Sequence, residues 1–124
     1  MTEVEERNRE MAMRWQDAWN DDAMRMVDEC YAEDCEVWDM VRGQCLRGRE
    51  ELRAVEQRIL AVDASRRMKI TKLVASGDTV AVEMEATWRD GTITINACVV
   101  LTFDNDGLVV SDHTYSPDPL GVTA

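Results

Sequence analysis

Hydrophobic residues recur every three or four positions in three stretches of the first half of the chain, a spacing that predicts amphipathic helices. In the first stretch, Met11, Trp15 and Trp19 lie four residues apart and share one face. Asn20-Asp21-Asp22 ends this helix, and either aspartate can cap the next one. The predicted helices cover residues 4–19, 23–31 and 49–62.

The third predicted helix has an apolar stripe that includes Leu52, Val55 and Ile59. The charged residues between them, Glu56 and Arg58 among others, are assigned to the side that faces water.

From Met68 onward the hydrophobic period changes from 3.6 to 2, which predicts strands. An earlier short strand is expected at residues 35–40, followed by a loop that Arg42-Gly43 opens. The later strands are expected at residues 68–75, 79–89, 92–103 and 108–116. Helices therefore come first and a long antiparallel meander follows, an α+β fold with the helices on one side of the sheet.

Asp90-Gly91 predicts a two-residue hairpin turn, because both central positions of such a turn need positive φ. Centring the turn there sets Trp88 opposite Ile93 and Val82 opposite Val99. The apolar face of the hairpin, which the helices must cover, then includes Met84, Trp88, Ile95 and Val99. The other face is mixed in character, so it either meets water or forms an interface between subunits.

With 124 residues, the chain has the size of one domain, expected to span 1–124. Its 25 acidic and 14 basic side chains give a net charge of −11. Such a charge disfavours nucleic acid and anionic membranes as partners. No apolar run approaches the ~18–20 residues of a membrane-spanning helix, and the acidic N-terminus is unlike a signal peptide. A cytoplasmic location is expected.

The four cysteines have no Cys-x-x-Cys spacing and are expected to be reduced and mostly buried. The single histidine, His113, has no neighbouring ligand motif for zinc. The chain is therefore expected to hold no metal.

Asp39 is the most conspicuous acid of the chain, because it follows the apolar pair Val37-Trp38 at the end of the first predicted strand. Two interpretations stay open for it. Either it turns to water at the strand end, or it lies in a partly dry pocket that raises its pKa and suits it to proton transfer.

The order of elements, with several local motifs, resembles the NTF2-like superfamily and, within it, the SnoaL-like and ketosteroid isomerase-like proteins. Together the motifs span nearly the whole chain. They are Trp15 to Asp22 at the end of the first helix, Tyr31-Ala32-Glu33-Asp34, Gly48-Arg49-Glu50-Glu51-Leu52, residues 74–82, and Phe103 to Val110. The resemblance implies a curved sheet wrapped around helices, forming a cone with an apolar pocket.

In ketosteroid isomerases an aspartate at the end of the first strand is the general base, and Asp39 matches its position. The two oxyanion donors of that family, a tyrosine and a protonated aspartate, align with Trp15 and Val99. An indole N–H can donate a hydrogen bond, whereas valine cannot. The Asp-Arg-Asp network of limonene epoxide hydrolases is not reproduced, since its last aspartate aligns with Thr114.

In the polyketide cyclase branch, an acid or a histidine on the last strand faces the pocket. The same alignment directs Val110, Asp112, Thr114 and Ser116 inward, which makes Asp112 a second candidate carboxylate. A register shifted by one residue would instead place His113 in the pocket.

The resemblance implies a cofactor-free enzyme that transfers protons on an apolar keto or polyketide-like compound, with Asp39 as base and Asp112 as its partner. Epoxide hydrolysis and a non-catalytic binding or accessory domain remain alternatives. A small apolar organic ligand and a homodimer through the mixed sheet face are expected. The residues expected to line the ligand site are Trp15, Trp19, Tyr31, Val37, Met84, Trp88, Ile95, Val99 and Thr114.

Overall fold

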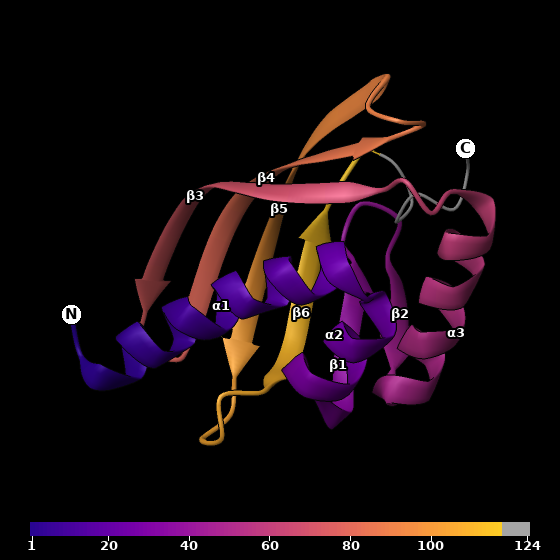
Figure 1. The fold of residues 1–124 in the computed structure, drawn as a ribbon. Coiled ribbons are helices and arrows are strands. Elements are labelled where there is room, and N and C mark those ends of the chain that lie inside the picture. The colour runs from indigo at the N-terminus through magenta and orange to yellow at the C-terminus, as the bar shows by residue number, and fades with distance from the viewer. Residues whose placement is uncertain (118–124) are drawn as a thin grey trace.

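A computed structural model describes residues 1–117, so the last seven positions of the predicted domain lie outside the described residues. Three helices and six strands follow one another in the order drawn in Figure 1. The elements are α1 (Glu3–Asp21), α2 (Ala23–Cys30), β1 (Tyr31–Asp39), β2 (Gln44–Arg47), α3 (Gly48–Val62), β3 (Arg67–Ser76), β4 (Thr79–Trp88), β5 (Ile93–Phe103) and β6 (Val109–Tyr115).

The N-terminal helices begin where the sequence supplies side-chain caps. Thr2 and Glu5 form a reciprocal capping box at the start of α1. The Asp22 carboxylate accepts hydrogen bonds from the backbone N–H groups of Met24 and Arg25, so Asp22 is the N-cap of α2. The predicted aspartate cap between the two helices is therefore confirmed.

The six strands form one sheet in the order β2-β1-β6-β5-β4-β3. Strands β3 to β6 pair antiparallel in sequence, as the meander predicts, but β1 lies parallel to β6. Two local predictions near β1 were wrong. The strand starts at Tyr31, four residues early, and the expected loop after Gly43 contains β2, which pairs with β1. A four-residue strand is too short to show a recognisable alternation.

The predicted register of the β4–β5 hairpin is confirmed. Trp88 pairs with Ile93 and Val82 with Val99. Both central residues of the turn have positive φ, 54° at Asp90 and 83° at Gly91, as the turn chemistry requires. On one hairpin face Met84, Val99 and most other side chains are buried as expected, and Ile93, Ile95 and Ala97 are partly buried.

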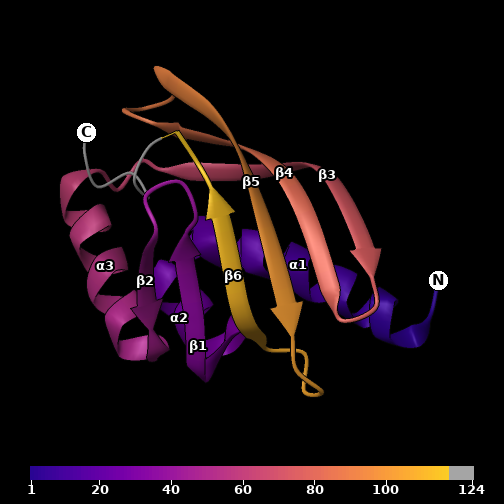
Figure 2. The ribbon, with the colours of Figure 1, turned by 180° about the vertical axis from the view of Figure 1, so that it is seen from behind.

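The helices cover one face of the sheet, and the sheet curves around them (Figure 1). Seen from behind, the opposite face of the strands carries no helix (Figure 2). The predicted α+β fold, a curved sheet with helices on one side, is thus confirmed. The core fills the space between, with Val27, Val80 and Leu101 fully enclosed. None of the helices in residues 1–117 has the length and apolar character needed to cross a membrane.

A core substitution tests this packing. Leu101 on β5 is 0% exposed, so Leu101→Ala leaves a cavity and should lower the free energy of unfolding by about 3 kcal/mol. Val74→Ala is the matched control, because Val74 is 55% exposed and its loss should cost less than about 0.5 kcal/mol. Urea unfolding of both variants measures the difference. Equal effects would contradict the packing described here.

Candidate functional site

A cavity of about 60 Å³ lies between the inner face of the sheet and the three helices. Its walls are mostly apolar and aromatic. Ten residues selected from the sequence line it, namely Trp15, Trp19, Tyr31, Val37, Met84, Trp88, Ile95, Val99, Asp112 and Thr114. They come from α1, β1, β4, β5 and β6, which the fold brings to one place.

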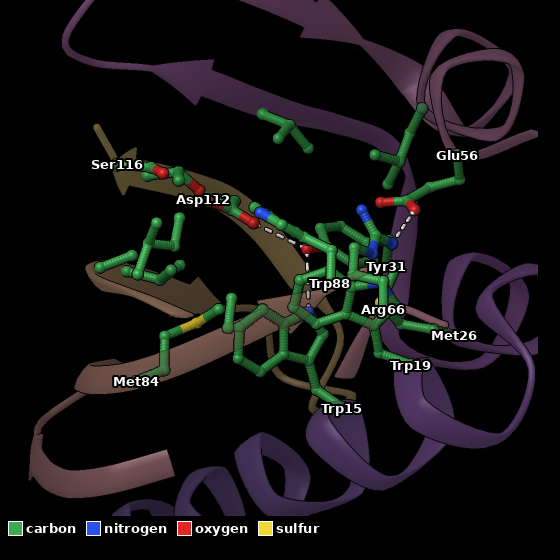
Figure 3. Close-up of a pocket in the computed structure, with 17 residues that line it drawn as sticks. Trp15, Trp19, Met26, Tyr31, Glu56, Arg66, Met84, Trp88, Asp112 and Ser116 are labelled. Carbon is green, nitrogen blue, oxygen red and sulfur yellow. Dashed lines mark hydrogen bonds and ion pairs between the residues drawn. The ribbon is translucent and has the colours of Figure 1, made fainter. Parts of the chain in front are cut away.

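Asp112 is the centre of a buried hydrogen-bond network in this pocket. The Tyr31 hydroxyl donates to Asp112 Oδ2 over 2.7 Å, and the Thr114 hydroxyl donates to Oδ1 over 2.7 Å. Behind Tyr31, the Trp15 indole N–H donates to the tyrosine oxygen over 3.0 Å. Figure 3 shows this chain running from Trp15 through Tyr31 to Asp112. Both carboxylate oxygens of Asp112 therefore have a neutral donor.

The register of β6 explains why Asp112 points inward. Asp112 and Thr114 are 3% and 9% exposed, whereas His113 between them lies on the other face and is half-buried. A bulge near Thr102 and Phe103 shifts the pairing of β5 with β6. As a result Val109 is enclosed in the core in place of Val110, and the inward assignment of Val110 was wrong.

Burial of Asp112 raises its pKa from 3.8 to about 6, because a charged carboxylate is poorly stabilised away from water. The hydrogen bonds from Tyr31 and Thr114 act in the opposite direction, and the nearby carboxylate of Glu56 adds to the rise. Burial also raises the pKa of Tyr31 well above its usual value, and the charge of Asp112 strengthens this effect. Tyr31 therefore stays protonated and acts as a donor.

A second polar group of the pocket wall is the ion pair of Glu56 and Arg66, which the sequence did not reveal. Arg66 Nη2 donates to Glu56 Oε2 over 2.6 Å, and both side chains are almost fully enclosed. Assigning Glu56 to the water-facing side of its helix was wrong. It lies one turn after Leu52, so the four-residue spacing from that buried leucine was the available signal.

Arg66 also stacks on an aromatic wall of the pocket. Its guanidinium carbon lies 4.1 Å from the centroid of the Trp19 ring, within the range of a cation–π contact. The Trp19 indole nitrogen is buried and has no hydrogen-bond partner among the described residues. Figure 3 shows Glu56 and Arg66 on the side of the pocket away from Ser116.

Asp39 has a different environment from the one expected. Its carboxylate accepts hydrogen bonds from the backbone N–H groups of Val41 and Arg42 and from the Arg42 guanidinium, over 3.0 to 3.2 Å. It is 5% exposed but does not line the pocket. Asp39 therefore does not share this cavity with Asp112, because a local turn and an ion pair engage its carboxylate.

In residues 1–117, no three acidic, histidine or cysteine side chains come together in a way that could hold a metal ion. The cysteines of this part of the chain are free thiols, and burial raises the pKa values of Cys30 and Cys35 to about 11.

Fold and site together define a small α+β cone with a buried carboxylate facing an apolar cavity. Residues 12–111 match the family model of the SnoaL-like domain, and the chain belongs to this family. No curated protein matches the chain.

Solved structures share the fold at low sequence identity. One is a protein with a ketosteroid isomerase-like fold from Catenulispora acidiphila DSM 44928, in complex with trimethylamine. It is 22% identical with a TM-score of 0.75, over 86% of this chain and 84% of that chain. An NTF2-like protein of unknown function from Burkholderia xenovorans LB400 is 19% identical with a TM-score of 0.80, over 95% and 88% of the two chains.

A third similar structure is a provisionally assigned SnoaL-like polyketide cyclase from Jannaschia sp. CCS1. It is 16% identical with a TM-score of 0.80, over 94% of this chain and 90% of that chain. The predicted NTF2-like, SnoaL-like and ketosteroid isomerase-like relationship is therefore confirmed at the level of family and fold.

The raised pKa of Asp112 predicts a specific pH dependence of stability. The folded chain holds this proton more tightly than the unfolded chain, so the contribution is complete below pH 3.8 and is lost as the pH rises through about 6. Relative to Asp112→Asn, the free energy of unfolding of the wild type should fall by about 2 kcal/mol between pH 4 and pH 7. Urea titrations at several pH values measure it.

Asp34→Asn serves as the control for this experiment, because Asp34 is exposed at the surface. The difference in free energy of unfolding between this variant and the wild type should change little between pH 4 and pH 7. If the difference in free energy of unfolding between the wild type and Asp112→Asn did not change with pH, the Asp112 carboxyl would not have a raised pKa.

Proposed function

We propose that this SnoaL-like domain is a cofactor-free enzyme that transfers a proton next to the carbonyl group of a small apolar compound. The observation that carries the proposal is the buried Asp112, whose pKa of about 6 lies close to neutral pH in an otherwise apolar pocket. This is the reaction type of isomerases and cyclases that act through an enolate.

Asp112 is the general base of the proposed reaction. At pH 7 a group of this pKa is roughly 90% ionised, yet it is basic enough to accept a proton from carbon. The Tyr31 and Thr114 hydroxyls orient the carboxylate and stabilise its charge before the reaction. Once Asp112 holds the substrate proton, it can return the proton to another carbon of the same molecule.

The size of the cavity limits the substrate. Its volume of about 60 Å³ is well below the ~150 Å³ of an apolar cavity that accommodates benzene. Typical ligand pockets measure about 300–1,000 Å³. A one-ring ketone would require the pocket to widen modestly and a steroid or polyketide would require it to widen considerably, so the proposed substrate is a small ketone of at most one ring.

Asp39 keeps a place in the proposal as the alternative base that its sequence position suggests. To act, its carboxylate would have to leave Arg42 and the two backbone N–H groups that it now binds. We assign it instead to holding the turn after β1 against the end of β6, because Arg42 also donates to the backbone oxygen of Ser116.

A second candidate function is the binding of a small amine without chemistry. Three tryptophans and the Asp112 carboxylate line the pocket, and aromatic walls with a carboxylate favour organic cations. The structure from Catenulispora acidiphila holds trimethylamine in a similar fold. Arg66 already occupies one face of Trp19, and its positive charge makes this candidate the weaker one.

The proposed proton-transfer activity is tested by the exchange of the α-protons of cyclopentanone in D₂O, which proton NMR follows. The wild type should accelerate exchange with a rate that rises as Asp112 ionises near pH 6. Asp112→Asn should lower the rate by about 100-fold or more, whereas Asp39→Asn should lower it less than about tenfold because Asp39 does not line the pocket.

The two variants separate the possible outcomes. Loss of exchange in Asp39→Asn alone would return the base assignment to Asp39. Absence of exchange in the wild type, together with saturable quenching of tryptophan fluorescence by trimethylammonium chloride, would favour the amine-binding function.

The sheet face without helices supports the expected homodimer. Val100 is half-buried and Tyr115 is 44% exposed on this side, and a partner sheet would cover both. We expect sedimentation equilibrium at micromolar concentration to show a dimer. Val100→Glu should shift it to monomer, because a carboxylate in a sheet-to-sheet interface loses its hydration. A monomeric wild type would exclude this assembly.

A further inference from the structure

The proposed reaction requires hydrogen-bond donors for the oxygen that gains negative charge as the proton leaves. Three donors around Asp112 already have partners. The Tyr31 and Thr114 hydroxyls donate to its carboxylate, and the Trp15 indole N–H donates to Tyr31. Val99 has no donor to offer. With these three engaged, donors on another wall of the pocket are needed to stabilise the developing charge.

Arg66 and Trp19 offer such donors. Both line the cavity, and Arg66 is 6% exposed. A guanidinium carries five N–H bonds, yet within residues 1–117 Arg66 makes a single hydrogen bond, to Glu56. The buried Trp19 indole N–H has no partner in the same range. A buried donor without an acceptor is costly and calls for an explanation, which an oxygen of the ligand would supply.

The position of Arg66 is held from two sides. On one side its guanidinium stacks on the Trp19 ring. On the other, the segment before it is attached to the tip of the β4–β5 hairpin. There Asp63 Oδ2 accepts a hydrogen bond from Arg89 N over 2.6 Å, and Ser65 Oγ accepts one from Asp90 N over 2.9 Å. Donors fixed in this way need little reorganisation when charge develops.

The charges of the pocket favour a neutral oxygen in the ligand. Glu56 already balances the positive charge of Arg66, and the carboxylate of Asp112 lines the same cavity. A ligand carboxylate would add a further negative charge to this site and to a chain of net charge −11. A ketone enters uncharged and becomes negative only during the reaction, when Arg66 can stabilise it.

We propose that Arg66 and the Trp19 indole N–H bind the carbonyl oxygen of a small neutral ketone and stabilise its enolate while Asp112 takes the α-proton. In this step the C–H bond breaks, its electron pair forms the carbon–carbon double bond, and the carbonyl oxygen takes the negative charge. The proton resides on the Asp112 carboxyl until it returns to carbon. This inference rests on the proposed function.

A pair of probes of nearly the same shape isolates the oxygen contact. Cyclopentanone and methylenecyclopentane differ in one group, since C=O is replaced by C=CH₂. Trp19→Phe keeps an aromatic ring beneath Arg66 but removes the N–H. It should raise the Kd of cyclopentanone about tenfold and change that of methylenecyclopentane less than about twofold. The fluorescence of Trp15 and Trp88, which also line the pocket, reports binding.

Proton exchange gives the second readout. Arg66→Lys should lower the exchange rate of cyclopentanone about 100-fold while its rise with pH stays near pH 6. The double variant Glu56→Gln/Arg66→Met, which leaves no unpaired charge behind, should show the same loss. Arg58→Met is the control on the exposed side of α3 and should exchange like the wild type. Urea midpoints confirm that each variant is folded.

These results separate the inference from the function on which it rests. If Asp112→Asn loses exchange but the Arg66 and Trp19 variants stay within twofold of the wild type, the donor assignment is wrong and the function stands. If the wild type shows no exchange, the function is wrong, and the differential binding of the two probes still decides the oxygen contact. If Trp19→Phe weakened the binding of both probes equally, the proposed contact with the carbonyl oxygen would be wrong.

Discussion

The burial of the Asp112 carboxylate is the constraint on which the rest of the pocket depends. A carboxylate inside an apolar cavity is tolerated only when its oxygens receive hydrogen bonds. One donor, Thr114, lies two residues further along β6, and the other, Tyr31, stands at the start of the parallel neighbour β1. Trp15 extends the network to α1. A helix and two strands thus meet at one carboxyl group.

The same burial links stability to chemistry. Loss of hydration raises the pKa of Asp112, and its two hydroxyl donors limit the rise, so the group titrates near neutral pH. At pH 7 the ionised carboxylate destabilises the fold relative to its protonated form. In the proposed reaction, the same raised pKa makes the carboxylate basic enough to accept a proton.

Two aspartates of the chain show how environment separates residues of the same type. Both are nearly enclosed, Asp39 at 5% and Asp112 at 3% exposure. Asp39 binds a cation and two backbone N–H groups at a turn, while Asp112 has only neutral donors and an open side toward the cavity. The partners of the two carboxylates, and not the depth of their burial, therefore distinguish their environments.

The sequence by itself determined the features that depend on local periodicity. The alternation of β4 and β5 around Asp90-Gly91 established which hairpin side chains face the helices, and the four-residue spacing of Trp15 and Trp19 established one wall of the pocket. A period of two defines the faces of a strand regardless of its neighbours.

Only the tertiary structure decided the contacts between distant segments. These include the pairing of β1 with β6, the bulge that buries Val109, the ion pair of Arg42 with Asp39, and the meeting of Glu56 and Arg66 at the pocket. The spacing from Leu52 could have indicated the buried face for Glu56, but no local pattern identifies Arg66 as its partner. Their positions follow from the packing of helices on the sheet, which brings together residues that no local pattern connects.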